Sequence, residues 1–190
     1  RPSHNVQAQA YYTYSKDFSD DDNERDPFTL RYAKITDLDA EYSYSDRDQR
    51  HRFNGWLLWN APYGLDFNVR DSYRSAQPKS IRADGTDANT PHERCVDSVI
   101  DTVCEADATV IKRNLGRKDN EYSALDFRLS KQFAMANGLT VEPAIDVFNL
   151  FNSENFRRPE VTNLVFNFDG TVQSGNGDPR QFQLALRLIW

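Results

Sequence analysis

Oxygen-bearing side chains gather in one long polar stretch of the sequence and are its first candidates for chemistry. Asp84, Asp87 and Asn89 lie within one short segment and could offer oxygen ligands to calcium. Their spacing differs from that of an EF-hand loop, in which a glutamate occupies the twelfth position. We therefore expect a solvated loop here, with calcium binding as the minor alternative.

Cys95 and Cys104 are the two cysteines of the chain, and both fall in the same polar stretch, 77–121. Two cysteines so close in a loop favour a local disulfide and, with it, an oxidising compartment. Two unrelated thiols are the alternative. A zinc site is less favoured, because His92 is the only histidine nearby and no paired CxxC motifs occur.

The remaining polar residues suggest no catalytic group. His51 lies in the segment DRDQRHRF, 46–53, whose alternating charges are most simply interpreted as charge pairs across neighbouring strands. The sequence contains no HExxH motif, no glycine-rich phosphate loop and no recognisable triad order. We therefore expect a protein that is not an enzyme and that holds no cofactor or metal.

Composition argues against two broad classes of protein, those that bind nucleic acid and those that span a membrane with helices. The net charge of −6, the pI of about 5.1 and the scattered placement of the 23 basic residues argue against a nucleic-acid partner. The mean hydropathy is −0.77, and no run approaches the roughly 18–20 apolar residues of a spanning helix. A transmembrane β-barrel is still allowed, because only every second residue of its strands faces lipid.

Strand-period alternation recurs along the chain and predicts an all-β protein, an antiparallel up-and-down meander of about six strands. The predicted strands are 5–15, 50–60, 65–75, 122–135, 139–151 and 180–190. Short turns, APYG at 61–64 and ANG at 136–138, alternate with long polar connections. Segment 32–46 either extends a strand or forms a small hairpin outside the main sheet. Short turns at one end and long loops at the other are typical of outer-membrane barrels.

Each predicted strand has one apolar and one polar face. A soluble sheet would expose the polar face to water, whereas a membrane barrel would turn it to a hydrated lumen and the apolar face to lipid. Three features favour the barrel: long strands, aromatic residues near strand ends, and an apolar terminal strand that would aggregate as a free edge. The predicted lumen-facing polar residues are Asp66, Arg70, Asp126, Arg128, Glu142, Asp146 and Arg187.

Several stretches resemble the TonB-dependent outer-membrane receptors, and within them the Oar-like group. They are YYTYSKDFSDD at 11–21, SDRDQRHRFNGWLLWNAPYGLDF at 45–67, LDFRLSKQFAM at 125–135, DVFNLFNSENF at 146–156 and PRQFQLALRLIW at 179–190. They occur in the order that this family shows near its C-terminus. The resemblance implies a bacterial outer-membrane location and a barrel of about 22 strands, plugged by an N-terminal domain.

The same resemblance implies energy-coupled uptake of a scarce nutrient, such as a siderophore or a carbohydrate. Residues 1–190 would form the C-terminal part of that barrel, with the plug and the earlier strands absent. The implied partners are outer-membrane lipid, the missing plug and barrel strands, the TonB complex acting through the missing N-terminal region, and the barrel assembly machinery. Phe182 and the terminal Trp190 would form the assembly signal that this machinery recognises.

Two other functions remain open at this point. One is a soluble all-β surface binding module. The other is a complete small outer-membrane barrel with a structural or adhesive role, which would need two further strands from about 28–44. The sequence indicates neither the transported ligand nor the oligomeric state.

Overall fold

The computed structural model describes residues 5–20, 32–88, 90–96, 104, 106–118, 120–155 and 179–190. The described chain contains β-strands, short 3-10 turns and loops. None of its described helical turns is long and apolar enough to cross a bilayer. The chain divides into two compact units. The sheet unit comprises residues 1–14, 51–75 and 120–190, and the loop unit comprises residues 15–50 and 76–119.

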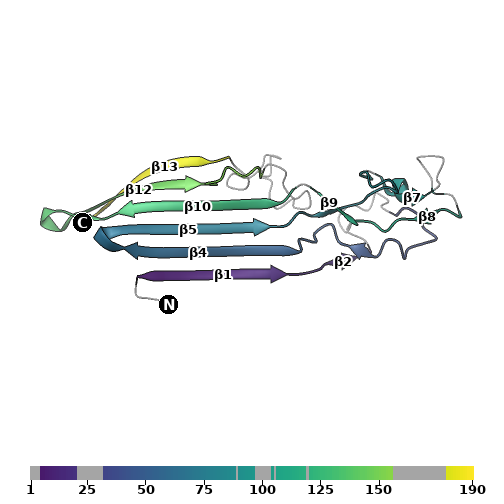
Figure 1. The fold of residues 1–190 in the computed structure, drawn as a ribbon, viewed down its shortest axis with the longest axis horizontal. Helices are drawn as coiled ribbons and strands as arrows, with labels where there is room; N and C mark the ends of the chain where they lie inside the picture. The colour runs from purple at the N-terminus through teal and green to yellow at the C-terminus, as the bar shows by residue number, and fades with distance from the viewer. Residues whose placement is uncertain are drawn as a thin grey trace. The chain divides into compact units, whose positions relative to one another are not determined.

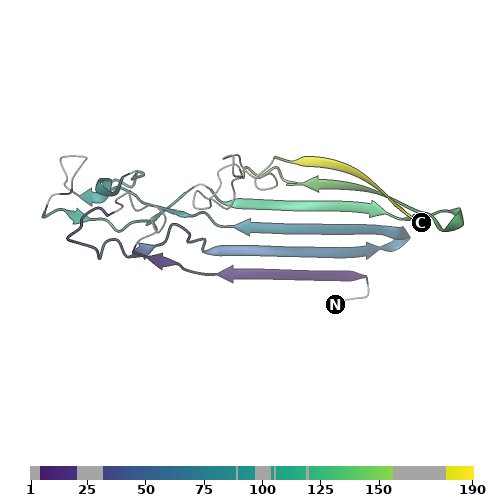
Figure 2. The ribbon, with the colours of Figure 1, turned by 180° about the vertical axis from the view of Figure 1, so that it is seen from behind.

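The sheet unit is built on one antiparallel sheet with the strand order β1-β4-β5-β10-β12-β13. The strands lie side by side in this order from both sides (Figures 1 and 2). This arrangement confirms the predicted all-β antiparallel meander. The bounds are β1 Val6–Tyr14, β4 His51–Ala61, β5 Leu65–Arg74, β10 Tyr122–Lys131, β12 Thr140–Phe148 and β13 Gln181–Ile189.

Two tight turns join neighbouring strands at one end of the sheet, which we call the turn end. The 3-10 turn η1, Pro62–Gly64, joins β4 to β5, and η3, Ala136–Gly138, leads into β12. Gly64 has a φ of 71° and Gly138 a φ of 80°, a left-handed conformation that glycine adopts without steric cost. The long connections 15–50 and 76–119 leave the opposite end, the loop end. The predicted loop 153–179 lies mostly outside the described residues.

The structure corrects the predicted strand 122–135, which is interrupted. β10 ends at Lys131, and the short strand β11, Phe133–Ala134, resumes the pairing with β12. The pairing of β10 with β12 ends at Ser130 opposite Ala144, and the residue before Ala144 is Pro143, which has no N–H to donate to the ladder. The amide of Gln132 instead donates to the carbonyl of Gly64 in η1, with an N–O distance of 3.0 Å.

The loop unit contains three two-stranded sheets, two of which lie entirely in the segment 77–121, which the sequence pattern indicated as a polar connection. They are β2 Phe18–Ser19 with β3 Ser43–Tyr44, β6 Pro78–Lys79 with β9 Gly116–Arg117, and β7 Cys95–Val96 with β8 Thr109–Val110. The first of these shows that part of segment 32–46 pairs outside the main sheet. A small apolar core of Ala33, Ala40 and Val110, with both cysteines packed against it, joins segments distant in sequence.

Candidate functional site

One face of the main sheet carries the polar residues that the sequence singled out. Residues directly opposite each other in a ladder point to the same face. The register pairs Asp126 with Arg70, and Arg128 with Asp146. The same rule, applied across β5, β10, β12 and β13, places the whole predicted set on this polar face: Asp66, Arg70, Asp126, Arg128, Glu142, Asp146 and Arg187.

Several of these polar side chains contact one another or the backbone. Arg128 Nη1 lies 3.2 Å from Asp146 Oδ1, and Arg187 Nη1 lies 3.8 Å from Glu142 Oε2. Asp126 accepts a hydrogen bond from the backbone amide of Asn149 at 3.0 Å. Pairs with an exposed partner contribute at most about 1 kcal/mol each, so these contacts position charge on the face more than they stabilise the sheet.

The opposite face of the sheet is apolar and uncovered. Leu184 is 80% exposed, whereas Asp146 on the polar face is only 7% exposed. Ile145, Leu186 and Leu188 on the apolar face are exposed as well. No described residue of the sheet unit forms a second layer over them. A water-soluble sheet would bury this face and expose the charges, so the observed arrangement requires an apolar surrounding.

Aromatic side chains form two rows on the apolar face, one toward each end of the strands. At the loop end, Tyr12, Phe53 and Tyr73 lie directly opposite one another. Toward the turn end, the rings of Trp59 and Phe67 stack with a centroid separation of 5.1 Å. Aliphatic residues of β4, β5 and β10 lie between the rows, with Asp71 as an exception beside Gly55. Two aromatic rows flanking an aliphatic band are typical of strands that cross a membrane.

His51 lies on the apolar face, not in the cross-strand charge pair that its sequence context suggested. Its Nδ1 is 2.7 Å from the hydroxyl of Tyr12, and its ring is 5.3 Å from that of Tyr14. The register brings Arg52, the next residue, opposite Arg74. Within β4, Arg52 therefore has no acidic residue opposite it, whereas Asp48 of the same segment pairs with Arg50 and with Arg117 of β9.

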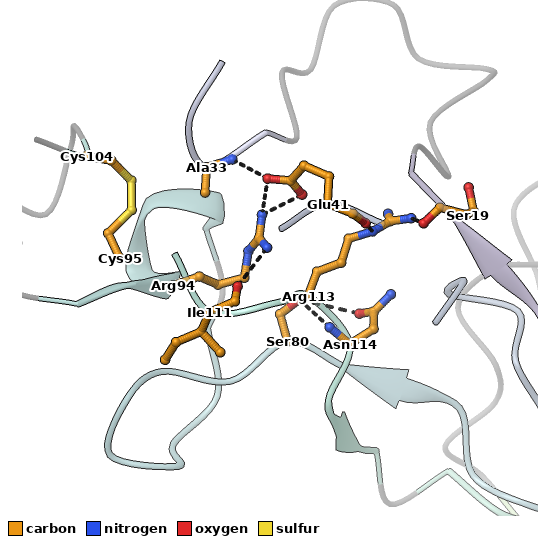
Figure 3. Close-up of polar contacts among 10 residues, drawn as sticks. All are labelled: Ser19, Ala33, Glu41, Ser80, Arg94, Cys95, Cys104, Ile111, Arg113 and Asn114. Atoms are coloured by element: carbon orange, nitrogen blue, oxygen red, sulfur yellow. Dashed lines mark hydrogen bonds and ion pairs between the residues drawn. A yellow bond between two sulfur atoms is a disulfide. The ribbon is translucent and has the colours of Figure 1, made fainter. Parts of the chain in front are cut away.

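The loop unit is held by a buried ion pair that sequence reasoning did not find. Arg94 Nη2 donates to both carboxylate oxygens of Glu41, at 2.6 and 2.7 Å, and the two side chains are 2% and 1% exposed (Figure 3). Glu41 also accepts from the amide of Ala33, and Arg94 Nη1 donates to the carbonyl of Ile111. Glu41 and Arg94 come from different loops, so no spacing in the sequence signals their meeting.

Further polar contacts tie the two long loops together within the loop unit. Arg113 donates to the carbonyl of Glu41 at 2.8 Å, and Asn114 Nδ2 donates to the carbonyl of Tyr44 at 2.7 Å. The buried carboxylate of Asp48 accepts from Arg117 at 2.8 Å. Each contact joins segment 15–50 to segment 76–119, so the long loops fold as one body and are not independent solvated chains.

Asp84 and Asp87, which were considered as calcium ligands, interact with other groups of the protein. Asp84 accepts hydrogen bonds from the side chain and amide of Thr86, which lower the pKa of its carboxyl group below the ordinary value. Asp87 pairs with Lys79 at 2.6 Å, and Asn89 lies outside the described residues. Within the described part of the chain, no three acidic, histidine or cysteine side chains are grouped as metal ligands.

Cys95 and Cys104 form a disulfide, which lies beside Arg94 (Figure 3). A closed loop of this length stabilises a fold by about 2–3 kcal/mol through the entropy of the unfolded chain. We expect neither thiol to react with a maleimide on intact cells until a reductant is added. We also expect Cys95→Ser with Cys104→Ser to make the loop unit more sensitive to protease. Labelling of the oxidised wild type would contradict this expectation.

The comparison with protein families identifies the class of this sheet. A family model described as an outer membrane β-barrel domain matches residues 1–76, which include β1, β4 and β5. The protein is an outer-membrane β-barrel protein. No curated protein and no solved structure matches the chain. The matched strands continue through an unbroken ladder into β10, β12 and β13, so the later strands extend the same sheet.

The outer-membrane barrel protein lies in the bacterial outer membrane, as predicted. In that location, the exposed apolar face is expected to contact lipid and the polar face to line the barrel interior. The disulfide suits this location, because compartments outside the inner membrane are oxidising. Phe182 near the start of β13 and Trp190 just after its last residue have the parity of the apolar face and are both exposed, and their role as an assembly signal remains a prediction.

Proposed function

We propose that this chain is the C-terminal part of the barrel of a TonB-dependent receptor, which takes up a scarce nutrient and is not an enzyme. The observation that carries the proposal is a single antiparallel ladder of six long strands whose outer strands, β1 and β13, do not pair with each other in the described structure. Such a ladder needs further strands to close, which a large plugged barrel supplies.

Two other features support the proposal. The loops at one end of the strands fold into a disulfide-bonded unit, while the other end carries turns of three residues. The polar face carries charges of both signs, which suits an interior occupied by a plug domain and passing solute. The proposed partners are therefore lipid, the plug and remaining strands, the TonB complex and the barrel assembly machinery, with no nucleic acid.

The alternatives have less support. A soluble binding module conflicts with the outer-membrane location and with the uncovered apolar face. A complete small barrel would need two more strands from 28–44. In the described part of that segment, 32–44, only Ser43–Tyr44 is a strand, and it pairs with β2 outside the main sheet.

Energy coupling is the test of the proposal. In the native bacterium, we expect deletion of this gene and deletion of the TonB gene to abolish uptake of the same nutrient. A panel of iron chelates, vitamins and oligosaccharides as sole sources identifies that nutrient. We also expect the full-length protein to be cross-linked to TonB in cells. Uptake that persists without TonB, or a protein that forms an open pore in planar bilayers, would contradict the proposal.

A further inference from the structure

Two arginines lie directly opposite each other on the polar face at the loop end of the sheet. The β4–β5 register pairs Arg52 with Arg74, and the β5–β10 register pairs Arg74 with Tyr122. Both arginine side chains are exposed, and the guanidinium carbon of Arg74 lies 5.5 Å from the centre of the Tyr122 ring. The row Thr13, Arg52, Arg74, Tyr122 thus carries two positive charges on neighbouring strands.

Nothing in the described sheet neutralises this pair. The acids of the polar face are engaged elsewhere: Asp146 contacts Arg128, and Asp66 accepts from Asn60. No described carboxylate lies within ion-pair distance of Arg52 or Arg74. Like charges directly opposite in a ladder destabilise a sheet. The pair therefore lowers the stability of the empty protein, and an anion bound between the two side chains would offset that cost.

The neighbouring row adds neutral hydrogen-bonding groups. Asn54 lies opposite Ser72, whose hydroxyl donates to Asn54 Oδ1 at 3.2 Å, and Tyr11 lies opposite Asn54 on β1. Two guanidinium groups beside amides and hydroxyls fit the planar, bidentate geometry of carboxylate and phosphate groups. The arginines lie on the face opposite Tyr12, Phe53 and Tyr73, which in a barrel is the hydrated interior, where a soluble anion and not a lipid headgroup is the expected ligand.

We propose that Arg52 and Arg74 form an anion-binding subsite that takes a carboxylate or phosphate group of a soluble solute. This inference names the solute class of the proposed uptake and rests on that function for the transport step, but binding to the purified protein is independent of TonB. The solute is then an anion with at least one oxygen-rich acidic group, held at the loop end of the polar face.

Thermal unfolding of the purified full-length protein tests this inference. Citrate and inorganic phosphate are the probes, with sodium chloride at equal ionic strength as the reference. We expect citrate to raise the Tm of the wild type, and Arg52→Gln and Arg74→Gln each to weaken citrate binding about tenfold, the effect of losing a charge-assisted hydrogen bond. Without citrate, both variants should melt at or above the wild-type Tm, because the like-charge contact is gone.

Arg82→Gln is the matched control, because Arg82 is a loop-unit arginine that is already paired with Glu93 at 2.5 Å. It should keep the full citrate shift. If citrate raised the Tm of the wild type, Arg52→Gln and Arg74→Gln equally, the inference would be overturned. It would also be overturned if the Tm rose only when lipopolysaccharide was added. Loss of TonB-dependent uptake does not enter this measurement, so failure of the proposed function and failure of the subsite give different results.

Discussion

Leu184→Arg is expected to remove most of the folded protein from the outer membrane, whereas Gln183→Arg leaves its amount nearly unchanged. The two residues are neighbours on β13 and point to opposite faces, with Leu184 opposite Ile145 and Gln183 opposite Asp146. An arginine facing lipid near the bilayer midplane costs about 2–4 kcal/mol, while the same side chain on a hydrated face costs little. Gln183→Arg also places a positive charge beside an acidic residue.

The measurement is the amount of the full-length protein in purified outer membranes, together with its heat-modifiable band on gels. Because both variants carry the same new side chain on the same strand, differences in helix or strand propensity cancel. Equal loss from both variants would show that β13 is sensitive to any charge. Equal tolerance would show that Leu184 does not face lipid, and the assignment of the apolar face would then be wrong.

Arg94→Met is expected to unfold the loop unit while leaving the barrel strands assembled. This substitution leaves Glu41 buried at 1% exposure without its charged partner. Breaking a buried ion pair by removing one partner costs about 3–5 kcal/mol, because an uncompensated charge remains inside. The loop unit has a small apolar core, so apolar burial contributes little to offset this cost.

Limited proteolysis of intact cells measures the unfolding of the loop unit in Arg94→Met, and the heat-modifiable gel band reports whether the barrel is assembled. Arg82→Met is the matched control, since Arg82 also pairs with a glutamate but is 42% exposed. The control should change protease sensitivity little, because exposed ion pairs contribute about 0–1 kcal/mol. Equal resistance of both variants would show that the Glu41–Arg94 pair does not hold the loops.

The sequence alone predicted the strands, the turns and the separation of the two faces, because these depend on local information. Side chains in a strand alternate with a period of two, so the parity of Leu184 and Asp146 predicted opposite faces before any register was known. Pro62 and Gly64 likewise predicted a tight turn from their own backbone preferences. The sequence also pointed to the outer membrane, through long-short alternation of the connections.

The interruption between β10 and β11, at Gln132, could be found only from the register of the strands. Proline at position 143 is visible in the sequence, but its effect on the ladder depends on which residue of β10 lies opposite it. The same holds for Arg52 and Arg74, which become a like-charge pair only when β4 and β5 are aligned. Alternation along one strand carries no information about the neighbour's alignment, and so the subsite was not predicted.

The sequence by itself determined where the six long strands of the main sheet lie and which face of each is apolar, since both follow from each segment alone. The tertiary structure decided that the long loops fold as a unit, because Glu41 and Arg94 are 53 residues apart in the sequence and form their ion pair only in the folded loop unit. Contacts of this kind arise from chain topology, and no periodicity within either loop encodes them.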